Sequence, residues 1–271
     1  MKTIGFIDYY LSEWHANNYP QWIREANERL GTDYRVAYAW GELETSPKYG
    51  ETSAQWCERN GVTLCATLEE LCEKSDVLLI LAPSDPERHL SYAQVALRYE
   101  KPTYIDKTFA PCLSDAEKIF SLGAQYHTPF FSTSALRYAE ELQELTDTSK
   151  LIITGGGGNL PEYLVHQVEM AVLLLNDPAE QAEVRCQGGQ VFCHVTTRHG
   201  KEVTFLYAPK MPFTLTAEAA DGTPLYRAVK SDYFRNLIAD ILRFYETGKP
   251  SFDSAQTLEV MRIRDMILQK I

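Results

Sequence analysis

The first half of the chain alternates short apolar runs with longer stretches in which apolar residues recur at helical spacing. The apolar runs predict strands, and they cover Lys2–Asp8, Tyr34–Trp40, Val62–Cys65, Val77–Leu81, Thr103–Asp106 and Phe130–Ser134. The intervening stretches predict helices, and these cover Asn17–Leu30, Thr52–Asn60, Thr67–Lys74, Pro86–Tyr99 and Ser114–Tyr126. Strands that alternate with helices over this length favour right-handed crossovers and a doubly wound parallel sheet.

The pattern changes near residue 135. Helical spacing predicts helices at Ala135–Thr146, Leu160–Leu175, Tyr233–Thr247 and Ser254–Ile271. Strands are predicted at Leu151–Thr154, Val184–Cys186, Val191–Thr197, Val203–Tyr207 and Phe213–Glu218. No helix-length pattern separates the last four strands, so we expect an antiparallel meander.

Together these patterns predict an α/β chain of two domains. Residues 1–134 would form a Rossmann-like domain with a doubly wound parallel sheet. Residues 135–271 would form an α+β domain with an open antiparallel sheet. We expect the last helix to pack back on the first domain, because its apolar residues need a cover.

Charge and composition exclude several classes of protein. The 271 residues carry a net charge of −11, which argues against nucleic acid or an anionic membrane as a partner. No apolar run has the length of a transmembrane helix, and Asp8 interrupts the only apolar run near the start, unlike a signal peptide. The six cysteines lack zinc-ligand spacing. We therefore expect a cytoplasmic protein with reduced thiols and no metal.

Two groups of residues are candidates for chemistry. Lys107 follows the predicted strand Thr103–Asp106, and ligands of open α/β sheets lie beyond the carboxyl ends of strands. Glu162, His166 and Glu169 are spaced so that they share one face of a helix. Histidine is the usual proton shuttle near neutral pH, and a neighbouring carboxylate would orient its ring. A solvated loop lysine and a solvated polar stripe are the alternative interpretations.

The order of motifs resembles the Gfo/Idh/MocA family of nicotinamide-dependent sugar oxidoreductases. Ile105-Asp106-Lys107-Thr108 resembles the Glu-Lys-Pro signature of that family, and Glu162-x-x-x-His166 resembles its Asp-x-x-x-His pattern. Val77–Pro83, followed by Ser84 and His89, resembles its strand, Thr-Pro-Asn turn and helix-borne histidine. Ser134–Tyr138 resembles its Asn-Arg-Phe crossing into the second domain, and the likeness extends over the whole chain.

The resemblance implies an NAD(P)-dependent oxidoreductase that acts on a hydroxyl group of a sugar, cyclitol or related small molecule. It implies that Lys107 holds or polarises the reacting oxygen, that His166 takes or gives its proton, and that Glu162 orients His166. NAD is favoured over NADP, because no basic residue stands beside Trp40. The implied substrate-binding residues are Arg137, Tyr138 and Tyr163. The implied cofactor-binding residues are Asp8, Tyr10, Ser12, Trp40, Ala82, Pro83, Ser84, His89 and Asp106.

The turn after the first strand departs from the family pattern. A dinucleotide fold normally carries Gly-x-Gly-x-x-Gly there, because only glycine lets the backbone approach the pyrophosphate. Here Asp8 and Tyr10 stand where the first two glycines would be, and an acid and a bulky ring would resist a pyrophosphate. Ser12 and the amides of the next helix remain as partners for a phosphate. The alternative function is a non-catalytic small-molecule-binding or assembly protein with a degraded cofactor site.

Two further features predict contacts rather than chemistry. The run Gly155–Gly158 either cradles a ligand or lets a strand and a helix approach closely, and close approach is the more common reason. Val191, Cys193 and Val195 alternate with Phe192 and His194, which leaves apolar side chains on both faces of a strand. Because a second apolar face needs a partner, we expect a homodimer or a higher homo-oligomer.

Overall fold

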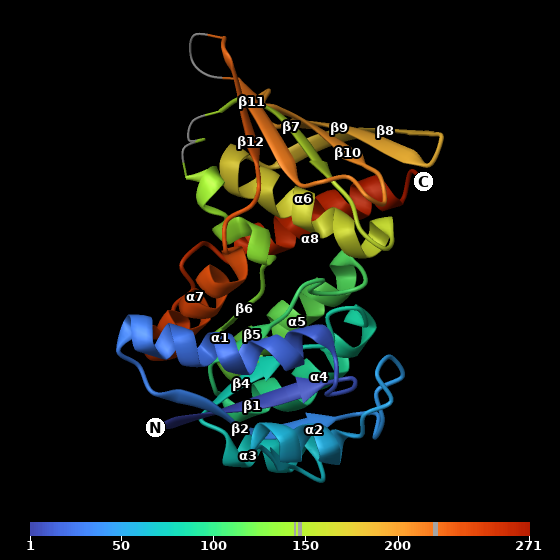
Figure 1. The fold of residues 1–271 in the computed structure, drawn as a ribbon. Coiled ribbons are helices and arrows are strands. Elements are labelled where there is room, and N and C mark those ends of the chain that lie inside the picture. Colours follow the sequence, from blue (N-terminus) through green and yellow to red (C-terminus); the bar gives the residue numbers. More distant parts are fainter. Residues whose placement is uncertain (144, 146–147, 219–221) are drawn as a thin grey trace. The chain divides into compact units, whose positions relative to one another are not determined.

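The computed structural model describes residues 1–143, 145, 148–218 and 222–271. The chain divides into two compact units (Figure 1). Unit 1 comprises Met1–Thr133 and Leu237–Ser254, and unit 2 comprises Ser134–Asn236 and Ala255–Ile271.

Unit 1 contains a parallel sheet of six strands in the order β3-β2-β1-β4-β5-β6. This arrangement confirms the predicted Rossmann-like doubly wound fold. The order reverses between β1 and β4, which is the point where such sheets bind ligands. The strands are β1 (Lys2–Asp8), β2 (Tyr34–Gly41), β3 (Thr63–Leu64), β4 (Val77–Ile80), β5 (Thr103–Ile105) and β6 (Phe130–Phe131).

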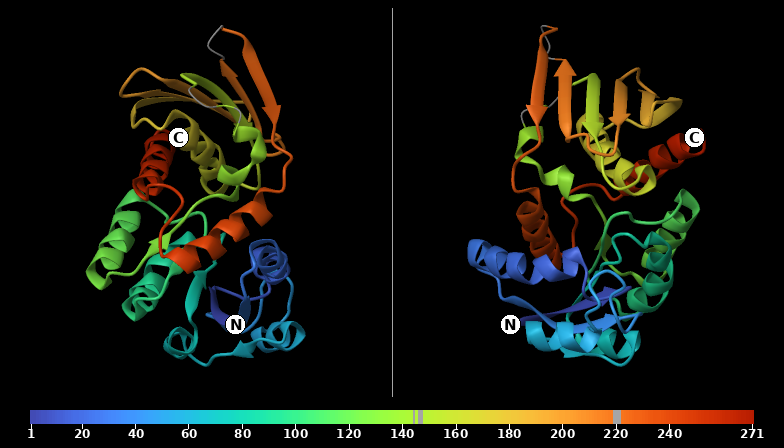
Figure 2. Two further views of the ribbon diagram at one scale, coloured as in Figure 1. Left: turned by 90° about the vertical axis from the view of Figure 1, so that its left-hand side faces the viewer. Right: turned by 45° about the vertical axis from the view of Figure 1, so that its right-hand side comes forward.

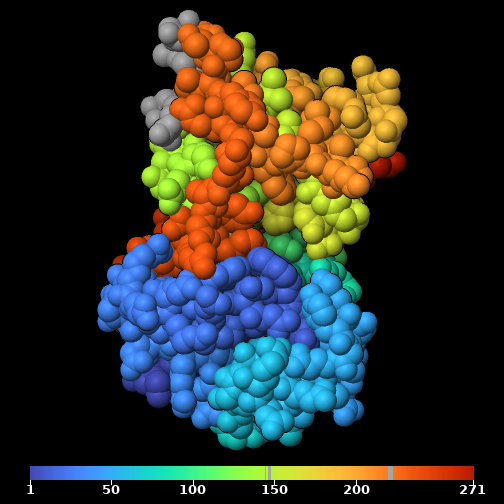
Figure 3. Space-filling model, in the orientation of Figure 1, coloured from blue at the N-terminus to red at the C-terminus, as the bar shows by residue number. Residues whose placement is uncertain are grey.

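The helices of unit 1 begin and end where local sequence signals place them. Thr52 and Thr67 cap two helices by accepting the amide protons of Gln55 and Glu70. In the space-filling view, α1 and the segment that carries α2 form much of the visible face of unit 1 (Figure 3). The helices are α1 (Trp14–Leu30), α2 (Ser53–Asn60), α3 (Leu68–Lys74), α4 (His89–Ala96) and α5 (Leu113–Tyr126), with 3₁₀ turns η1 (Pro86–Arg88) and η2 (Leu97–Tyr99).

Unit 2 contains a mixed, mostly antiparallel sheet in the order β12-β11-β7-β10-β9-β8 (Figure 2). The mostly antiparallel sheet is confirmed, and β8, β9 and β10 form three strands of the predicted meander. The fourth predicted strand, Phe213–Glu218, corresponds to β11, which pairs with β7 instead of β10. The central pair, β7 with β10, is parallel, which corrects the purely antiparallel expectation. Helix α6 (Leu160–Leu175) follows β7 and carries the chain across one sheet face, so a later strand can return parallel to β7. The strands are β7 (Lys150–Gly155), β8 (Ala179–Gln187), β9 (Gln190–Thr197), β10 (Glu202–Tyr207), β11 (Thr214–Glu218) and β12 (Pro224–Ala228).

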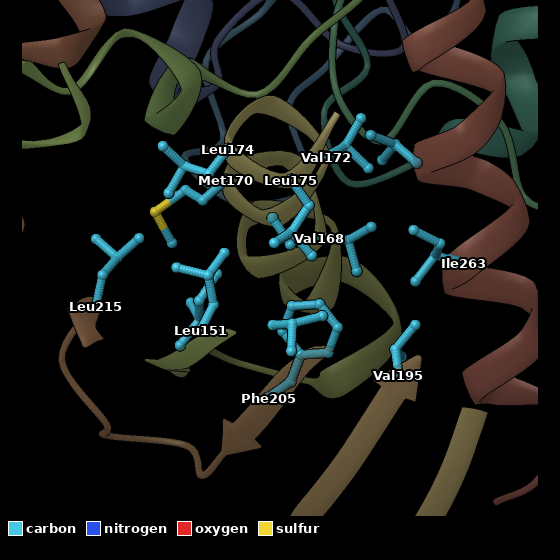
Figure 4. Packing of buried hydrophobic residues seen from close by; sticks show 14 of the residues in the cluster. Leu151, Val168, Met170, Val172, Leu174, Leu175, Val195, Phe205, Leu215 and Ile263 are labelled. Carbon is cyan, nitrogen blue, oxygen red and sulfur yellow. The ribbon is translucent and has the colours of Figure 1, made fainter. Parts of the chain in front are cut away.

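The core of unit 2 lies between this sheet and the helices α6 and α8 (Ala255–Leu268). Phe205 and Val195 extend from the strands toward Val168 of α6 and Ile263 of α8 (Figure 4). Alternate strand residues enter this core, as the period of two predicts. Burial of each such side chain stabilises the unit by about 1.5–3 kcal/mol.

Two elements differ from the sequence prediction. The last helix, α8, packs on α6 and β8 within unit 2, because its apolar residues Val260, Ile263 and Ile267 join the core of that unit. The segment that groups with unit 1 is instead Leu237–Ser254, which includes most of α7 (Tyr233–Thr247).

The predicted helix at Ala135–Thr146 is wrong. Its described part forms two 3₁₀ turns, η3 (Ala135–Tyr138) and η4 (Glu140–Leu142), and Thr146 lies outside the described residues. The three residues 135–137 are all buried, and the turn places Arg137 against Glu169 of α6, a contact distant in sequence that the helical spacing does not show. The Ser134 hydroxyl caps the first turn by accepting the Leu136 amide proton.

Candidate functional site

The carboxyl ends of three neighbouring strands bring the first group of candidate residues together. β1 ends at Asp8, β4 is followed by Ala82 and Pro83, and β5 is followed by Asp106 and Lys107. The Lys107 Nζ donates to the Pro83 carbonyl at 3.2 Å. Only 8% of Lys107 is exposed, so it is not a solvated loop lysine. The structure therefore joins the lysine to the turn after β4.

Asp8 links β1 to the same turn. Its Oδ1 accepts the amide protons of Tyr9 and Ala82, at 2.7 and 3.0 Å. Its Oδ2 is buried and has no hydrogen-bond partner among the described residues. Burial raises the pKa of Asp8 well above its usual range, and the nearby Glu13 charge adds to the effect. Burial therefore favours the protonated form of Asp8, in which Oδ2 can act as a hydrogen-bond donor.

Asp106 and His89 organise the loop after β5. Asp106 Oδ1 accepts from the Lys107 amide at 2.9 Å and the Tyr104 hydroxyl at 3.2 Å, whereas its Oδ2 lies 3.7 Å from His15 Nε2. The buried His89 ring lies between two carbonyls, with Nδ1 3.0 Å from Phe109 O and Nε2 2.5 Å from Leu81 O. Burial lowers the pKa of His89. His89 thus ties the loops after β4 and β5 together.

Sequence reasoning missed the residue that dominates the turn after β1. Glu13 is the N-cap of α1, and its buried carboxylate accepts the Ala16 amide proton. Its Oε2 lies 3.2 Å from His15 Nδ1. Burial opposes ionisation, but the hydrogen bonds and charge of His15 outweigh it and lower the pKa of Glu13. The sequence carried little signal for it, because the predicted helix begins at Asn17 and glutamate is not a common N-cap.

After β2, the carboxylate of Glu42 is engaged by two side chains of the described structure. Glu42 accepts from the Tyr92 hydroxyl at 2.6 Å and forms an ion pair with Arg88 at 3.1 Å. Trp40 packs edge-on against Tyr92, with ring centroids 5.6 Å apart. The sequence argument for NAD assumed that no basic residue lies near Trp40. Arg88, which comes from η1 far along the chain, removes the basis of that argument, because an arginine near this acid is a feature of sites that accept a 2′-phosphate.

The remaining residues of the predicted cofactor set line the turns. Ser12 is buried, and its carbonyl accepts from the Ser46 hydroxyl at 2.6 Å. Tyr10 is half-buried, and burial together with the Asp85 charge raises its pKa to about 12. Ser84 is exposed at the turn after β4.

The turn after β1 does not fit a pyrophosphate in this arrangement. A dinucleotide phosphate needs the free amides at the N-terminus of the first helix. Here the Ala16 amide is satisfied by the buried, ionised Glu13, and a second anion beside it would meet like-charge repulsion. Asp8 is a smaller obstacle than the sequence suggests, because burial raises its pKa and so disfavours a second negative charge in this turn.

In unit 2 the second group of candidates forms a connected network. His166 Nδ1 lies 2.6 Å from the Ser134 hydroxyl, and the Ser134 amide donates to Glu169 at 3.2 Å. Glu169 also accepts from Arg137 Nε at 2.6 Å in a buried ion pair. Arg137 donates to Gln256 as well, at 2.8 Å. The structure therefore connects His166 to Glu169 through Ser134, the first residue of the motif Ser134–Tyr138.

Glu162 and the two tyrosines lie around the start of α6 and the turn before it. Glu162 and Asn159 cap the helix reciprocally, since Asn159 Oδ1 accepts the Glu162 amide proton and its Nδ2 donates to Glu162 Oε2. Tyr163 packs against the His166 ring with centroids 5.6 Å apart. Tyr138 accepts from Asn236 through its carbonyl.

The glycine run before α6 permits close approach of the backbone. A Cβ atom on Gly156 would lie 1.8 Å from the Ala208 carbonyl oxygen, and one on Gly157 would lie 2.0 Å from the Tyr163 ring. Both distances are far inside van der Waals contact. Close packing therefore accounts for glycine at these two positions, in line with the more common of the two interpretations.

The described residues contain neither a candidate metal site nor a membrane-spanning helix. No group of three or more His, Cys, Asp or Glu side chains within residues 1–143, 145, 148–218 and 222–271 is arranged to hold a metal ion. Over the same ranges, no helix combines the length and apolar character needed to cross a membrane.

Comparisons with known proteins identify the fold. No family model matches the chain, and no curated protein matches it by sequence. Solved structures match over the full length. UDP-N-acetylglucosamine 3-dehydrogenase GnnA from Acidithiobacillus ferrooxidans is 13% identical, with a TM-score of 0.77 over 100% of this chain and 97% of that one. Biliverdin reductase from Synechocystis sp. PCC 6803, in complex with biliverdin and NADP+, is 14% identical, with a TM-score of 0.72 over 99% and 98%.

An NAD-binding protein from Listeria innocua is 12% identical, with a TM-score of 0.72 over 99% of this chain and 94% of that one. At such identities the similarity shows the fold alone. That fold is the one of the Gfo/Idh/MocA-type dehydrogenases, so the resemblance detected in the sequence is confirmed at the level of the fold.

Proposed function

We propose that this protein is an oxidoreductase that acts on a hydroxyl-bearing sugar, cyclitol or related small polar molecule, with NAD(P) as the hydride carrier. The observation that carries the proposal is the buried Lys107 at the carboxyl end of β5, beside the switch point of a dehydrogenase fold. A lysine in such a place contributes a point charge and donors that can hold a substrate oxygen. The Ser134–His166–Glu169 network supports the same proposal.

The proposed roles follow from these contacts. Lys107 holds or polarises the reacting oxygen, and its position is set by the Pro83 carbonyl. His166 takes or gives the proton of that oxygen. Ser134 contacts the ring through Nδ1, and we assign the proton transfer to Nε2. Arg137, Tyr138 and Tyr163 remain candidates for substrate binding, with Arg137 acting mainly through its ion pair with Glu169. Because the turn after β1 does not fit a pyrophosphate as it stands, we derive no step through the dinucleotide.

A second candidate function is a non-catalytic small-molecule-binding or assembly protein of the same fold. The specific observation that favours it is Glu13, whose carboxylate stands where a phosphate would bind. Titration of the purified protein with NADH and with NADPH, followed by nicotinamide fluorescence, separates the two functions. Saturable binding of either dinucleotide supports the oxidoreductase, whereas no binding of either supports the second candidate.

We predict that Lys107→Met abolishes turnover, because Met keeps much of the buried stem but cannot hold an oxygen. The assay is dinucleotide reduction with a panel of polyols, cyclitols and nucleotide sugars. We expect a loss of at least about a hundredfold in kcat/KM, about 2.7 kcal/mol of transition-state stabilisation.

The matched control is Lys118→Met, an exposed lysine on α5 that should leave turnover unchanged. Circular dichroism must show that both variants are folded. Retention of parental turnover by a folded Lys107→Met protein would contradict the proposed role.

A further inference from the structure

The turn after β1 contains its own anion. Glu13 places its carboxylate at the N-terminus of α1, where it accepts the Ala16 amide proton. The partial positive charge at a helix N-terminus favours an anion at that place. His15 holds the same carboxylate from the other side at 3.2 Å, and only 5% of Glu13 is exposed. The side chain is thus firmly placed.

A second observation, independent of the helix end, concerns Asp8 at the other end of this turn. Its Oδ2 is buried and lacks a partner among the described residues, and burial raises the pKa of the carboxyl group well above its usual range. A protonated carboxyl oxygen without an acceptor is a donor that an entering phosphate oxygen would satisfy. At one end of the turn, the Glu13 carboxylate occupies the place of an anion. At the other end, the Asp8 carboxyl group could donate a hydrogen bond to an anion.

We propose that Glu13 is an internal competitor for the diphosphate of a dinucleotide, so that the cofactor binds only when this carboxylate leaves the N-terminus of α1. The inference rests on the proposed function, because it specifies how that site is regulated. It explains why a chain with the dehydrogenase fold can lack the glycine-rich turn. The turn is closed by the Glu13 side chain, which would have to leave its partners Ala16 and His15 before a diphosphate could enter.

The test uses inorganic pyrophosphate, NADH and NADPH as separate probes. Binding is followed by tryptophan fluorescence, since Trp14 is the residue next to Glu13 and is 40% exposed, and by calorimetry. Glu13→Ser removes the charge and keeps a good helix cap. Glu13→Gln removes the charge and keeps the length of the side chain. Glu28→Gln is the matched control, because it makes the same change of charge at an exposed position on α1.

We expect Glu13→Ser to bind pyrophosphate and one of the dinucleotides at least about tenfold more tightly than the parent, and Glu28→Gln to match the parent. Glu13→Gln should fall between them, because its amide still occupies the space.

The outcomes separate the two proposals. Tighter binding of pyrophosphate by Glu13→Ser, with no binding of a dinucleotide by any form, supports the competitor and refutes NAD(P) as the carrier. Equal binding of dinucleotide by the parent and both Glu13 variants refutes the competitor and leaves the oxidoreductase standing. Failure of folded Glu13→Ser and Glu13→Gln to gain affinity for pyrophosphate also refutes the competitor.

Discussion

Two acids at the ends of one short turn show how environment decides the charge of a residue. Asp8 is surrounded by protein and receives only two backbone amide bonds, so burial dominates and raises its pKa. Glu13 is also buried, but His15 and the amides at the start of α1 compensate, and its pKa is lowered. The sequence shows both as acids in a turn. Their pKa values move in opposite directions because burial outweighs the amide hydrogen bonds at Asp8, whereas the hydrogen bonds and charge of His15 outweigh burial at Glu13. The burial that shifts Asp8 follows from the fold and not from the local sequence.

The raised pKa of Asp8 predicts a pH-dependent stability. In the unfolded chain this group titrates near 3.8, and in the folded protein it titrates higher. Folding is therefore penalised as the pH rises above 3.8, by about 1.4 kcal/mol per pH unit until the folded pKa is reached. Asp8→Asn removes this penalty and keeps the acceptor for Tyr9 and Ala82. We expect Asp8→Asn to be more stable than the parent at pH 7 in urea denaturation, with the advantage fading toward pH 3.5.

The control for this experiment is Asp33→Asn, which makes the same change at an exposed acid. An advantage of Asp8→Asn that is constant from pH 3.5 to 8 would contradict the raised pKa of Asp8 and point to a packing effect.

At the scale of elements, the sequence predicted the helices and strands that are marked by local patterns, such as an apolar run or a terminal glycine. Each strand of the parallel sheet was a short apolar run, and Gly31 and Gly61 mark the ends of α1 and α2 at positive φ. The predicted helix after Ser134 is wrong, and the 3₁₀ turns found there carry Arg137, whose Nε donates to the distant Glu169. Helix α8 lies in unit 2, where its apolar residues join the core. β12 had no strand pattern and gains its form by pairing with β11.

The candidate-site residues likewise fall into those that the sequence indicated and those that only the structure shows. Lys107 and His166 were found from their spacing and their place in predicted elements. Glu13, Ser134 and Arg88 were missed, because their roles depend on partners that are distant in sequence or on the geometry of a turn.

The glycine run before α6 allows a test of close packing at this scale. Gly156→Ala would place a Cβ atom 1.8 Å from the Ala208 carbonyl oxygen, and backbone must shift to relieve the contact. We expect a loss of about 1–3 kcal/mol in the free energy of unfolding, measured by urea denaturation. Gly158→Ala is the matched control, because the nearest atom to its Cβ would lie 3.8 Å away. Equal stability of the two variants would show that the turn rearranges freely.

At the scale of the whole molecule, the sheet of unit 2 has one face that α6 and α8 do not cover. Ile152 and Tyr226 are 50% and 59% exposed on its strands. A hollow of about 410 Å³ lies on this face, and its lining includes Ile152, His194 and Thr204. Six strands at about 4.8 Å spacing and roughly six residues of about 3.3 Å each give a face on the order of 600 Å². That area approaches the roughly 800 Å² that each partner buries in a stable interface.

We therefore predict that the protein is a homodimer or higher homo-oligomer that uses this face. Sedimentation velocity at micromolar concentration should show an assembly larger than the 30.8 kDa chain. Ile152→Asp should dissociate it, because a carboxylate buried against apolar groups without a partner is costly. Leu64→Asp makes the same kind of change at a residue of β3 in unit 1 that is 41% exposed, and it should leave the assembly intact. A parent that sediments as a monomer, or an Ile152→Asp protein that stays assembled, would refute the use of this face.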